Sequence, residues 1–472
     1  MPINSFLYPG AKFTPAYEVA NSLRFNRGSA DHLTRSVSGS STTKATYSVW
    51  FKKTINGVEQ CLYAIDDGTN EVRINFTTSD TIQVFHYASG YTYQIATNRV
   101  FRDCSAFYNI MIVVDTTQGT DTNRVKIYVN GVQETSLATT NYPSQNTDSF
   151  FFQSATLYLG VEENGSSNPI DGYIAEHIVC QGQALIPTDV GEFDSDTNIW
   201  KPIDVSGLTF GTNGFYLDFE NASSLGADVS GNGNNFTVNN LTSIDQSTDT
   251  CTNNFCVINS LDNYFASSDF SEGNLKVSTD SSNYSFSRGT IGVSSGKWYF
   301  EHKIVTQVSD HLIGIVSKAS TSTTDWIGLT ADTWGWITNG SNKSELSNNN
   351  SRTDVSSSGG YPTDGDIIGV YIDLDNNKLY FAKNGTLVSS TGQSLTASAS
   401  TTDGFYYPAA GDFTTNTNVM EFNFGGGSVS AISSGNSDPN GYGNFEYSTT
   451  ITGDGSSKSF YAICTKNLAE FG

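Results

Sequence analysis

Positive charge is the scarcest property of this 472-residue chain. Lysine and arginine together number 24 against 47 aspartates and glutamates, so the formal net charge is −23. The phosphates of nucleic acids and the headgroups of anionic membranes repel a chain of this charge, and we therefore exclude nucleic-acid binding. Charged residues of both signs make up only 15% of the chain, so serine, threonine, asparagine and glycine must supply most of its polar surface.

Long apolar runs are missing too. No segment reaches the run of about 18 apolar residues that a membrane-spanning helix requires, so no membrane insertion is predicted. The first residues have neither the basic nor the apolar region of a secretory signal peptide. A protein of this kind is expected to be made in a reducing cytoplasm and to reach the outside of a cell by lysis.

Signatures of catalysis and of zinc binding are also lacking. The six cysteines include no Cys-x-x-Cys pair, and the five histidines form no partnering cluster. Cys251 and Cys256 are close enough in sequence to pair across a small loop; the alternative is that all six cysteines are isolated thiols. No Gly-x-Ser-x-Gly, phosphate-loop or dinucleotide glycine pattern occurs in a strand-to-helix context.

Two similar strand pairs are the clearest feature that the sequence does have. Residues 367–374 are almost all apolar, 375–377 read Asp-Asn-Asn, and 379–382 alternate before an Asn-Gly pair. Asparagine and aspartate favour turns, and Asn-Gly favours a type I′ hairpin turn. The segment 110–131 repeats the pattern with an apolar strand, a polar turn and an alternating strand that ends in Asn-Gly. Each apolar strand is expected at the centre of a sheet.

The two pairs lie about 250 residues apart, which is more than one β-sandwich usually spans and too long for the period of a solenoid. The sequence therefore predicts an all-β protein of two tandem jelly-roll β-sandwiches. The predicted parts are a short N-terminal arm (1–20), a first sandwich (21–190), a β-containing connector (191–260), a second sandwich (261–426) and a C-terminal extension (427–472).

The first predicted sandwich carries motifs of a known family. Residues 22–33 read Ser-Leu-Arg-Phe-Asn-Arg-Gly-Ser-Ala-Asp-His-Leu. This resembles the Leu-x-Phe-Asp-Gly-x-x-Asp-Tyr-Leu opening of laminin-G-like, concanavalin-A-like jelly rolls. Asn26 and His32 replace the usual aspartate and tyrosine, and Arg27 splits the turn. Further matches follow in the family's order at 47–51, 126–131, 157–160 and 170–177.

The second predicted sandwich resembles another family. Residues 292–301 end in Gly-Lys-Trp-Tyr-Phe-Glu, which is similar to the leading core strand of SPRY domains. Segments in that family's order follow at 313–315, 334–336, 364–385, 405–409 and 419–425. The resemblance implies a β-sandwich that binds partners and is not catalytic.

Three short segments, 228–236, 441–447 and 461–468, resemble parts of tailed-phage structural proteins. The resemblance implies a virion protein, a tail fibre or surface appendage, assembled in the host cytoplasm and displayed on the phage particle. Its partners would be other virion proteins and a host-surface glycan or envelope protein, and such fibres are homo-oligomers, often trimers. No heptad or collagen repeat is present to build a shaft, so a capsid decoration or head-appendage protein is the alternative.

A third alternative is a polysaccharide depolymerase, because jelly rolls of the first family include glycoside hydrolases. Such enzymes need two carboxyl groups on one strand face, about 5–5.5 Å apart for a retaining mechanism. The nearest candidate, Glu-Phe-Asp-Ser-Asp at 192–196, follows Gly191 in the connector and not a strand pattern. We expect these carboxyl groups to be solvated charges of a linker. The sequence therefore predicts no catalytic residues, and a protein that is not an enzyme.

Loops at one end of a sandwich commonly carry its binding residues. Tyrosine rings beside amide and hydroxyl donors suit sugars, and two places in the sequence combine them. The predicted ligand-binding residues are Tyr87, Tyr91 and Tyr93 around the Ser89-Gly90 turn, and Tyr361 after the Asn-, Ser- and Gly-rich loop 338–360. The alternative is that these tyrosines cover the surface or pack against neighbouring subunits.

Calcium is the one cofactor that the sequence leaves open. Asp228, Ser230 and Asn232 place oxygen atoms at alternate positions, with a glycine at the sixth, as in a calcium-binding loop. The twelfth position is Asn239 and not the bidentate glutamate of such loops. The alternative is that Asn232 and the glycine after it simply form a tight turn.

Overall fold

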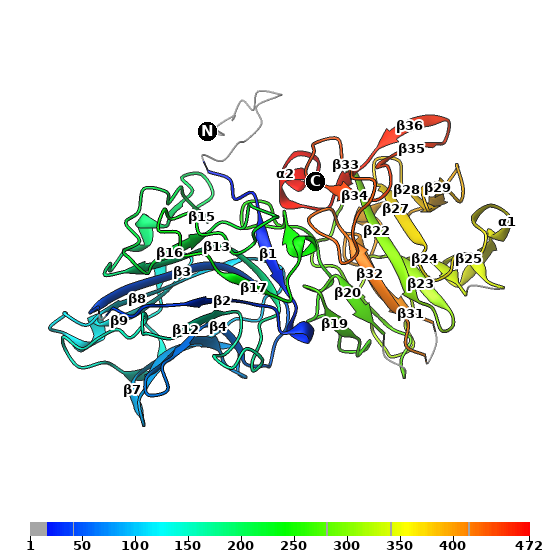
Figure 1. The fold of residues 1–472 in the computed structure, drawn as a ribbon. Helices are drawn as coiled ribbons and strands as arrows, with labels where there is room; N and C mark the ends of the chain where they lie inside the picture. The colour runs from blue at the N-terminus through cyan, green and yellow to red at the C-terminus, as the bar shows by residue number, and fades with distance from the viewer. Residues whose placement is uncertain (1–16, 41, 280–281, 340–341, 414–415) are drawn as a thin grey trace, which may run out of the picture.

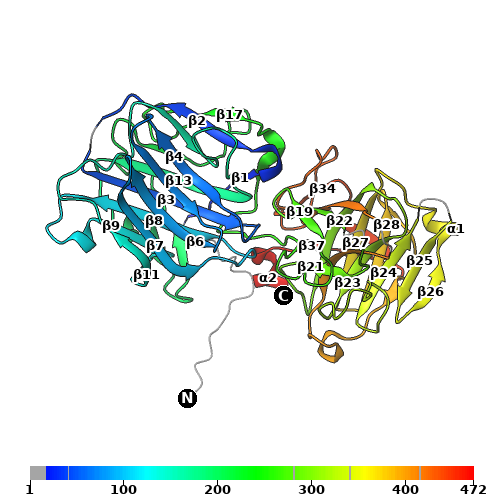
Figure 2. The same cartoon turned by 90° about the horizontal axis from the view of Figure 1, so that it is seen from below.

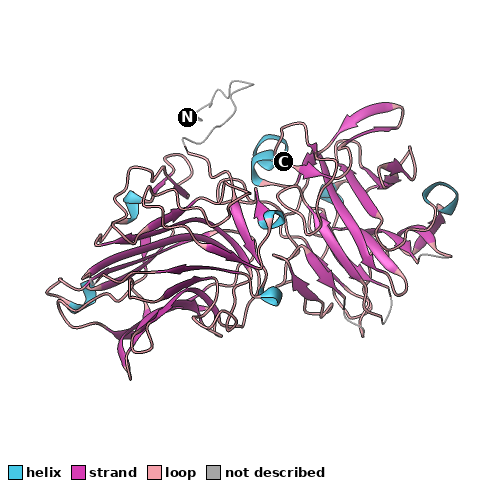
Figure 3. Ribbon diagram, in the orientation of Figure 1, coloured by secondary structure: helices cyan, strands magenta, loops and turns pink. Residues whose placement is uncertain are grey.

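The computed structural model describes residues 17–40, 42–279, 282–339, 342–413 and 416–472. The chain forms two β-sandwiches that lie side by side (Figure 1), and they remain side by side in the perpendicular view of Figure 2. Strands dominate, and the helices are short (Figure 3): α1 (Ser356–Gly359), α2 (Thr465–Phe471) and five 3-10 turns among the described residues. The predicted all-β class with two sandwiches is confirmed. Most of the predicted N-terminal arm lies outside the described residues.

No helix within the described ranges is both long and apolar enough to cross a lipid bilayer.

Two eight-stranded sheets form the first sandwich. We call them the β3 sheet and the β5 sheet, each after a central strand. The β3 sheet runs in the order β10 (Val132–Gln133), β9 (Val125–Val129), β8 (Tyr108–Asp115), β3 (Lys44–Lys53), β13 (Gly172–Gln181), β1 (Ser22–Phe25) and β18 (Gln246–Ser247), with β16 (Phe215–Leu217) also paired to β13. The β5 sheet runs in the order β11 (Leu137–Asn141), β7 (Tyr91–Val100), β6 (Thr81–Tyr87), β5 (Glu71–Phe76), β4 (Gln60–Asp66), β12 (Thr156–Leu159), β2 (His32–Ser36) and β17 (Thr237–Asn239).

The second sandwich packs a nine-stranded β22 sheet against a six-stranded β23 sheet. The β22 sheet runs in the order β19 (Asp269–Ser271), β20 (Lys276–Ser278), β32 (Val419–Asn423), β22 (Lys297–Thr306), β27 (Ile367–Asp373), β28 (Lys378–Lys383) and β29 (Thr386–Leu387), with β30 (Gln393–Ser394) paired to β28 and β37 (Tyr461–Ala462) paired to β22. The β23 sheet runs in the order β21 (Phe286–Arg288), β31 (Tyr407–Asp412), β23 (His311–Val316), β24 (Thr333–Thr338), β25 (Ser344–Asn348) and β26 (Ser351–Asp354).

Three further strand pairs lie outside these sheets: β14 (Gly191–Phe193) with β15 (Trp200–Pro202), β33 (Asn436–Ser437) with β34 (Asn444–Phe445), and β35 (Thr450–Gly453) with β36 (Ser456–Ser459).

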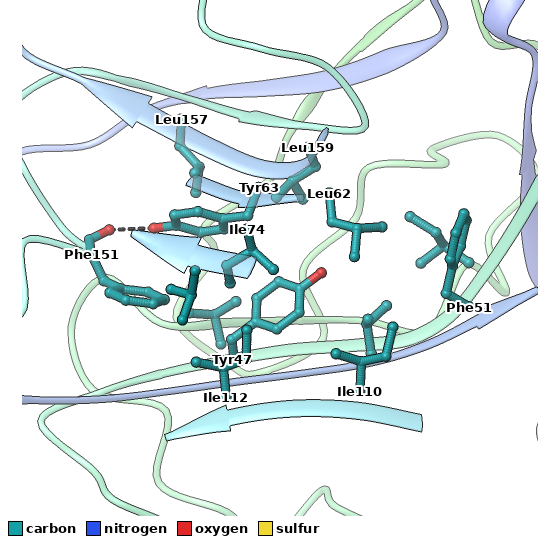
Figure 4. Packing of buried hydrophobic residues seen from close by; sticks show 14 of the residues in the cluster. Tyr47, Phe51, Leu62, Tyr63, Ile74, Ile110, Ile112, Phe151, Leu157 and Leu159 are labelled. Atoms are coloured by element: carbon teal, nitrogen blue, oxygen red, sulfur yellow. Dashed lines mark hydrogen bonds between the residues drawn. The ribbon is translucent and has the colours of Figure 1, made fainter. Parts of the chain in front are cut away.

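The alternation of side chains along the strands builds the core of the first sandwich. Ile110 and Ile112 of β8 face Tyr63 and Ile74 of the opposite sheet (Figure 4). The hydroxyl of Tyr63 donates a hydrogen bond to the carbonyl oxygen of Phe151 and so is satisfied inside the core (Figure 4). Full burial of each such apolar side chain is worth about 1.5–3 kcal/mol, so this cluster supplies much of the stability of the sandwich.

Both predicted strand pairs are confirmed, and both lie inside their sheets. They are β27 with β28 and β8 with β9. The turn after β28 has φ +47° at Asn384 and +78° at Gly385. Positive φ at both central residues defines the type I′ turn that the Asn-Gly pair predicted.

Two segments expected to be irregular form strands instead. The predicted loop 338–360 contains β25, β26 and α1, and the start of the connector contains β14. The side chains of β26 are all exposed, so no apolar alternation marks this edge strand in the sequence. Its place is set by backbone pairing with β25, a contact that local sequence patterns do not report.

The connector joins the two sandwiches through buried polar contacts. Its strands β16, β17 and β18 pair with β13, β2 and β1 of the first sandwich. Lys52 of β3 is fully buried, and its ammonium donates to Asp249 (2.8 Å), Asn254 (2.8 Å) and the carbonyl oxygen of Phe255 (3.0 Å). Across the junction, the hydroxyl of Tyr173 donates to the carbonyl oxygen of Gly273. The two sandwiches therefore share a continuous buried junction.

Candidate ligand-binding face of the first sandwich

Three of the four outer sheet faces are covered by other segments of the chain. Over the β3 sheet, the segment after β13 buries apolar side chains of β8 and β13. Over the β22 sheet, the C-terminal extension buries tyrosines of β22, β27 and β28. Over the β23 sheet, the segment between β23 and β24 buries apolar side chains of those two strands. The covering side chains are Val190, Val205 and Phe210 over the β3 sheet. They are Phe445, Ile451 and Phe460 over the β22 sheet, and Trp326 and Ile327 over the β23 sheet.

The outer face of the β5 sheet is different, because no comparable apolar cluster of the described residues lies over it. Directly paired residues of antiparallel strands point to the same face. The pairing register therefore places one row of side chains across this face. From β7 to β2, the row is Gln94, Phe85, Arg73, Ala64, Tyr158 and Thr34.

Tyr87 and Tyr91 form an exposed aromatic pair on this face. They are 41% and 50% exposed and pair directly across the β6–β7 hairpin. Their rings meet edge to face with centroids 5.3 Å apart, and the ring of Tyr91 also contacts Phe85 at 5.4 Å. The structure thus brings together two of the predicted ligand residues and adds Phe85, whose alternation with Tyr87 on β6 is a sequence signal that points to it.

The prediction for Tyr93 is wrong. Its side chain is 1% exposed, and its hydroxyl donates to the carbonyl oxygen of Ser149 in the core. A β-bulge causes the difference: Tyr91 pairs with Tyr87, but Tyr93 pairs with His86, so β7 carries one extra residue there. The bulge turns Tyr93 to the opposite face from Tyr91, although residues two positions apart on a regular strand point to the same face.

Tyr361 lies on the other sandwich. It follows α1, which sits at the end of the second sandwich that points away from the first (Figures 1 and 2). Its side chain is exposed. The structure therefore does not bring Tyr361 to Tyr87 and Tyr91, and a ligand contact at Tyr361 stays a separate prediction.

A cluster of charges that the sequence did not predict adjoins the aromatic pair. Arg73 lies with its guanidinium carbon 5.9 Å from the ring centre of Phe85. The guanidinium contacts Glu71 of the same strand, and it binds Glu162 at 2.6 Å and Glu163 at 2.8 Å. Burial raises the pKa of the Glu71 carboxyl above its usual range, and the charge of Arg73 opposes this rise. Some 90 residues separate Arg73 from its two loop partners, so no local motif reveals the cluster.

Asn75, next to this cluster, is fully buried on the same face. Its amide nitrogen donates to Glu59 at 2.7 Å. Its side-chain oxygen has no hydrogen-bond partner among the described residues. Burial, and then the charge of Glu162, raise the pKa of the Glu59 carboxyl. Acceptor oxygens of Asn75 and Glu59 therefore lie beside the charged cluster, with that of Asn75 buried beneath the face.

The predicted calcium loop is a hydrogen-bonded clasp. One oxygen of Asp228 accepts from the backbone of Tyr216 (3.0 Å) and Ser230 (2.9 Å), and the other accepts from the Ser230 hydroxyl and the Asn234 backbone. Asn232 donates its amide nitrogen to two carbonyl oxygens of the preceding turn. Within the described residues, no group of three or more histidine, cysteine, aspartate or glutamate side chains is placed to hold a metal ion. Both Cys251 and Cys256 are free thiols.

Replacing Asp228 by alanine distinguishes a loop held together by hydrogen bonds from a loop that binds calcium. We expect Asp228→Ala to lower the free energy of unfolding by about 1–3 kcal/mol, because buried backbone donors lose their acceptor. The measurement is urea unfolding with and without calcium. A calcium-dependent rise in the stability of the wild-type protein that Asp228→Ala abolishes would show that the loop binds the ion.

Comparison with known proteins matches this architecture in two places. Residues 27–190 match the model of the concanavalin A-like lectin/glucanases superfamily, in its laminin-G type. Residues 297–427 match the model of the SPRY domain. No match was found among curated proteins.

Solved structures show likenesses in fold. A Bacteroides ovatus ATCC 8483 protein named for carbohydrate binding is 15% identical over 48% of this chain and 60% of its own, with a TM-score of 0.34. The SPRY domain of human HERC1 is 16% identical over 33% of this chain and 90% of its own, with a TM-score of 0.25. The CBM40 of a Ruminococcus gnavus IT-sialidase, bound to α2,3-sialyllactose, is 15% identical over 32% of this chain and 81% of its own, with a TM-score of 0.25.

At these identities and TM-scores, none of the three structures bears on the ligand of this chain, and the chain spans only about 60% of the Bacteroides protein. The family models and the two sandwiches agree in position and in order. Residues 27–190 belong to a concanavalin-A-like lectin/glucanase domain of the laminin-G type, and residues 297–427 belong to a SPRY domain that follows it.

Proposed function

We propose that this protein is a non-enzymatic carbohydrate-binding protein, and that the outer face of the β5 sheet is its glycan-binding surface. The observation that carries the proposal is the exposed pair Tyr87 and Tyr91, which lies on the one sandwich face without an apolar cover among the described residues. Sugar rings present patches of C–H bonds that pack on aromatic rings. Their hydroxyl groups need polar partners beside those rings.

The side chains around the tyrosine pair suit such a ligand. Gln83 and Gln94 are partly exposed on neighbouring strands and bond to each other at 3.2 Å. Their remaining amide groups point from the same face as Phe85, so they are placed to exchange hydrogen bonds with hydroxyl groups of a bound sugar.

Substitution of both tyrosines tests the proposal. Each half-exposed ring that a sugar covers is worth about 1 kcal/mol, so Tyr87→Ala with Tyr91→Ala should weaken glycan binding at least about tenfold. Binding is measured on a glycan array and then by calorimetry with the glycans that bind. The matched control is Tyr264→Ala, since Tyr264 is 86% exposed and lies outside the face.

Unchanged binding in the double variant would refute this surface. Tyr361→Ala, measured in parallel, shows whether the second sandwich has a ligand contact of its own. Thermal unfolding of each variant shows that a loss of binding is not a loss of fold.

The proposal that the protein is not an enzyme is supported by how its carboxylates are engaged. Glu71, Glu162 and Glu163 converge on the guanidinium of Arg73, so all three carboxyl groups are already engaged in ion pairs. Glu192 and Asp194 lie at the β14–β15 hairpin, where both pair with Lys201. Release of reducing sugar from a bound polysaccharide by the purified protein would refute this part and favour the depolymerase alternative.

The setting that we propose is the surface of a phage particle, as a homo-oligomeric tail fibre or surface appendage, with a capsid decoration or head-appendage protein as the alternative. An acidic, hydroxyl-rich surface and the resemblance of three segments to phage structural proteins support it. Immunogold labelling of particles places the protein on tail or head. Binding to a purified host envelope protein, but to no glycan, would change the proposed ligand and keep the setting.

A further inference from the structure

We propose that the glycan recognised by this face is uncharged or carries amino groups, and that the face rejects glycans with carboxylate, sulfate or phosphate groups. This inference rests on the proposed function and names the chemical class of its ligand. It follows from the charges that the fold places beside the aromatic pair.

In the charged cluster next to the tyrosines, the positive charge of Arg73 is fully paired with carboxylates. Arg73 is bound by three carboxylates, those of Glu71, Glu162 and Glu163. Three carboxylates against one guanidinium leave two negative charges in this cluster. Its side chains are only 9–23% exposed, so they are held in place and are partly shielded from water.

This cluster touches the place where the ligand would lie. Glu71 pairs directly with Tyr87 across β5 and β6, and Arg73 pairs directly with Phe85. Direct cross-strand neighbours have Cβ atoms about 4.5–5.5 Å apart. A sugar on the rings of Tyr87 and Tyr91 therefore has the carboxylate of Glu71 beside it, and Arg73 with its other partners lies two residues further along β5.

An anionic group on the ligand would meet these carboxylates, and the charge of Arg73, the cation of this cluster among the described residues, is already paired with them. At such distances like charges repel even at a protein surface, and the repulsion grows at low salt because the Debye length rises to about 30 Å at 0.01 M. Exclusion of one ligand class by placing like charge against it is a common source of specificity.

The polar atoms of the cluster region are mostly acceptors, which suits hydroxyl or ammonium donors better than anionic groups. Two acceptor oxygens of the cluster region, Oδ1 of Asn75 and Oε2 of Glu163, are buried and have no hydrogen-bond partner among the described residues. Asn75 is fully buried and lies on β5 two residues beyond Arg73, on the same face. A buried acceptor without a donor is costly, and these two oxygens add acceptor character, and no donor for an anion, next to the carboxylates.

The test uses pairs of related glycans whose two members differ in charge. Homogalacturonan is measured with its carboxyl groups methyl-esterified and free, chitin oligomers are compared with deacetylated ones, and lactose with sialyllactose, each against the full-length protein at low and high salt. For the galacturonan and lactose pairs, we expect the neutral member to bind at least fivefold more tightly than the anionic one at low salt, and for the chitin pair we expect the deacetylated oligomers to bind at least as tightly as the acetylated ones. High salt should narrow that difference.

A variant then locates the effect. Glu162→Gln with Glu163→Gln leaves Arg73 paired with Glu71 alone and removes the two excess negative charges, so the anionic member of the pair should gain affinity relative to the neutral one. Anionic glycans that bind the wild-type protein as tightly as neutral ones, with Tyr87 and Tyr91 still required, would overturn the inference and leave the proposed function standing. Absence of binding to every glycan of either charge would instead refute the proposed function, and the inference with it.

Discussion

Replacing Lys52 by methionine should destabilise the protein by about 3–5 kcal/mol, the largest effect that we expect from a single substitution outside the apolar cores. Lys52 and Asp249 are both buried, with side chains 0% and 3% exposed, and their charges lie 2.8 Å apart. Burial raises the pKa of Asp249, and the charge of Lys52 opposes the rise. Methionine fills the space of the lysine stem but leaves the carboxylate without its cation.

The reason for the size of the effect is desolvation. A buried carboxylate that loses its partner keeps the full cost of its removal from water, because no solvent can reach it. The same substitution also removes the donor to Asn254 and to the carbonyl oxygen of Phe255. Urea unfolding followed by tryptophan fluorescence measures the loss.

A second variant separates the charge from the packing. Lys52→Met combined with Asp249→Asn removes both charges, and asparagine can still accept the hydrogen bond from the Phe255 backbone. We expect this double variant to recover at least half of the lost stability. If it is as unstable as Lys52→Met alone, the junction depends on the packing of the lysine stem and not on the ion pair.

Acidification from pH 6 to pH 4.5 should destabilise the protein by about 1–3 kcal/mol per pH unit. Burial lowers the pKa of four histidines in the folded protein, to about 3 for His177 and His311, to about 4 for His86 and well below the usual range for His302. These histidines stay neutral in the folded protein but take up protons when it unfolds. The free energy of unfolding therefore decreases as the pH falls below about 6.5.

Buried carboxyl groups act in the opposite direction, and Asp171 and Glu176 are two of them. Burial raises the pKa of Asp171 to about 6 and that of Glu176 to about 7, so at pH 5 they hold protons in the folded state that they lack when unfolded. Their contribution is present at low pH and is lost as the pH rises through their folded pKa values. The four histidines outnumber these two carboxyl groups, so we expect unfolding to take up protons and the free energy of unfolding to fall on acidification.

His177 allows this account to be checked. Its ring is fully buried between Tyr47 and Phe215, and neither nitrogen has a hydrogen-bond partner among the described residues. His177→Phe should reduce the slope of stability against pH by about 1.4 kcal/mol per unit, the contribution of one proton. The slope of the free energy of unfolding against pH is what is measured. The stability at a single pH is not informative, because the larger phenylalanine ring changes the packing equally at every pH. A slope equal to that of the wild-type protein would show that His177 does not titrate in this range.

Local signals account for what could be predicted. The strand pairs β27–β28 and β8–β9 combine an apolar run with an Asn-Gly turn, and both properties depend only on neighbouring residues. The motifs of the two families are equally local, so the identity and order of the two sandwiches were available before any coordinates. The exposed edge strand β26 lacked such a signal, because its stability comes from pairing with β25 and not from apolar alternation.

The sequence alone thus determined an acidic all-β chain of two sandwiches with aromatic residues near a turn, since composition, alternation and turn residues act at short range. Only the tertiary structure decided which outer face stays uncovered, that a bulge turns Tyr91 outward and Tyr93 inward, and that residues some 90 positions apart gather around Arg73. These features arise from pairing between strands and from the segments that pack over the sheets, and such long-range contacts leave no periodic trace in the residues themselves.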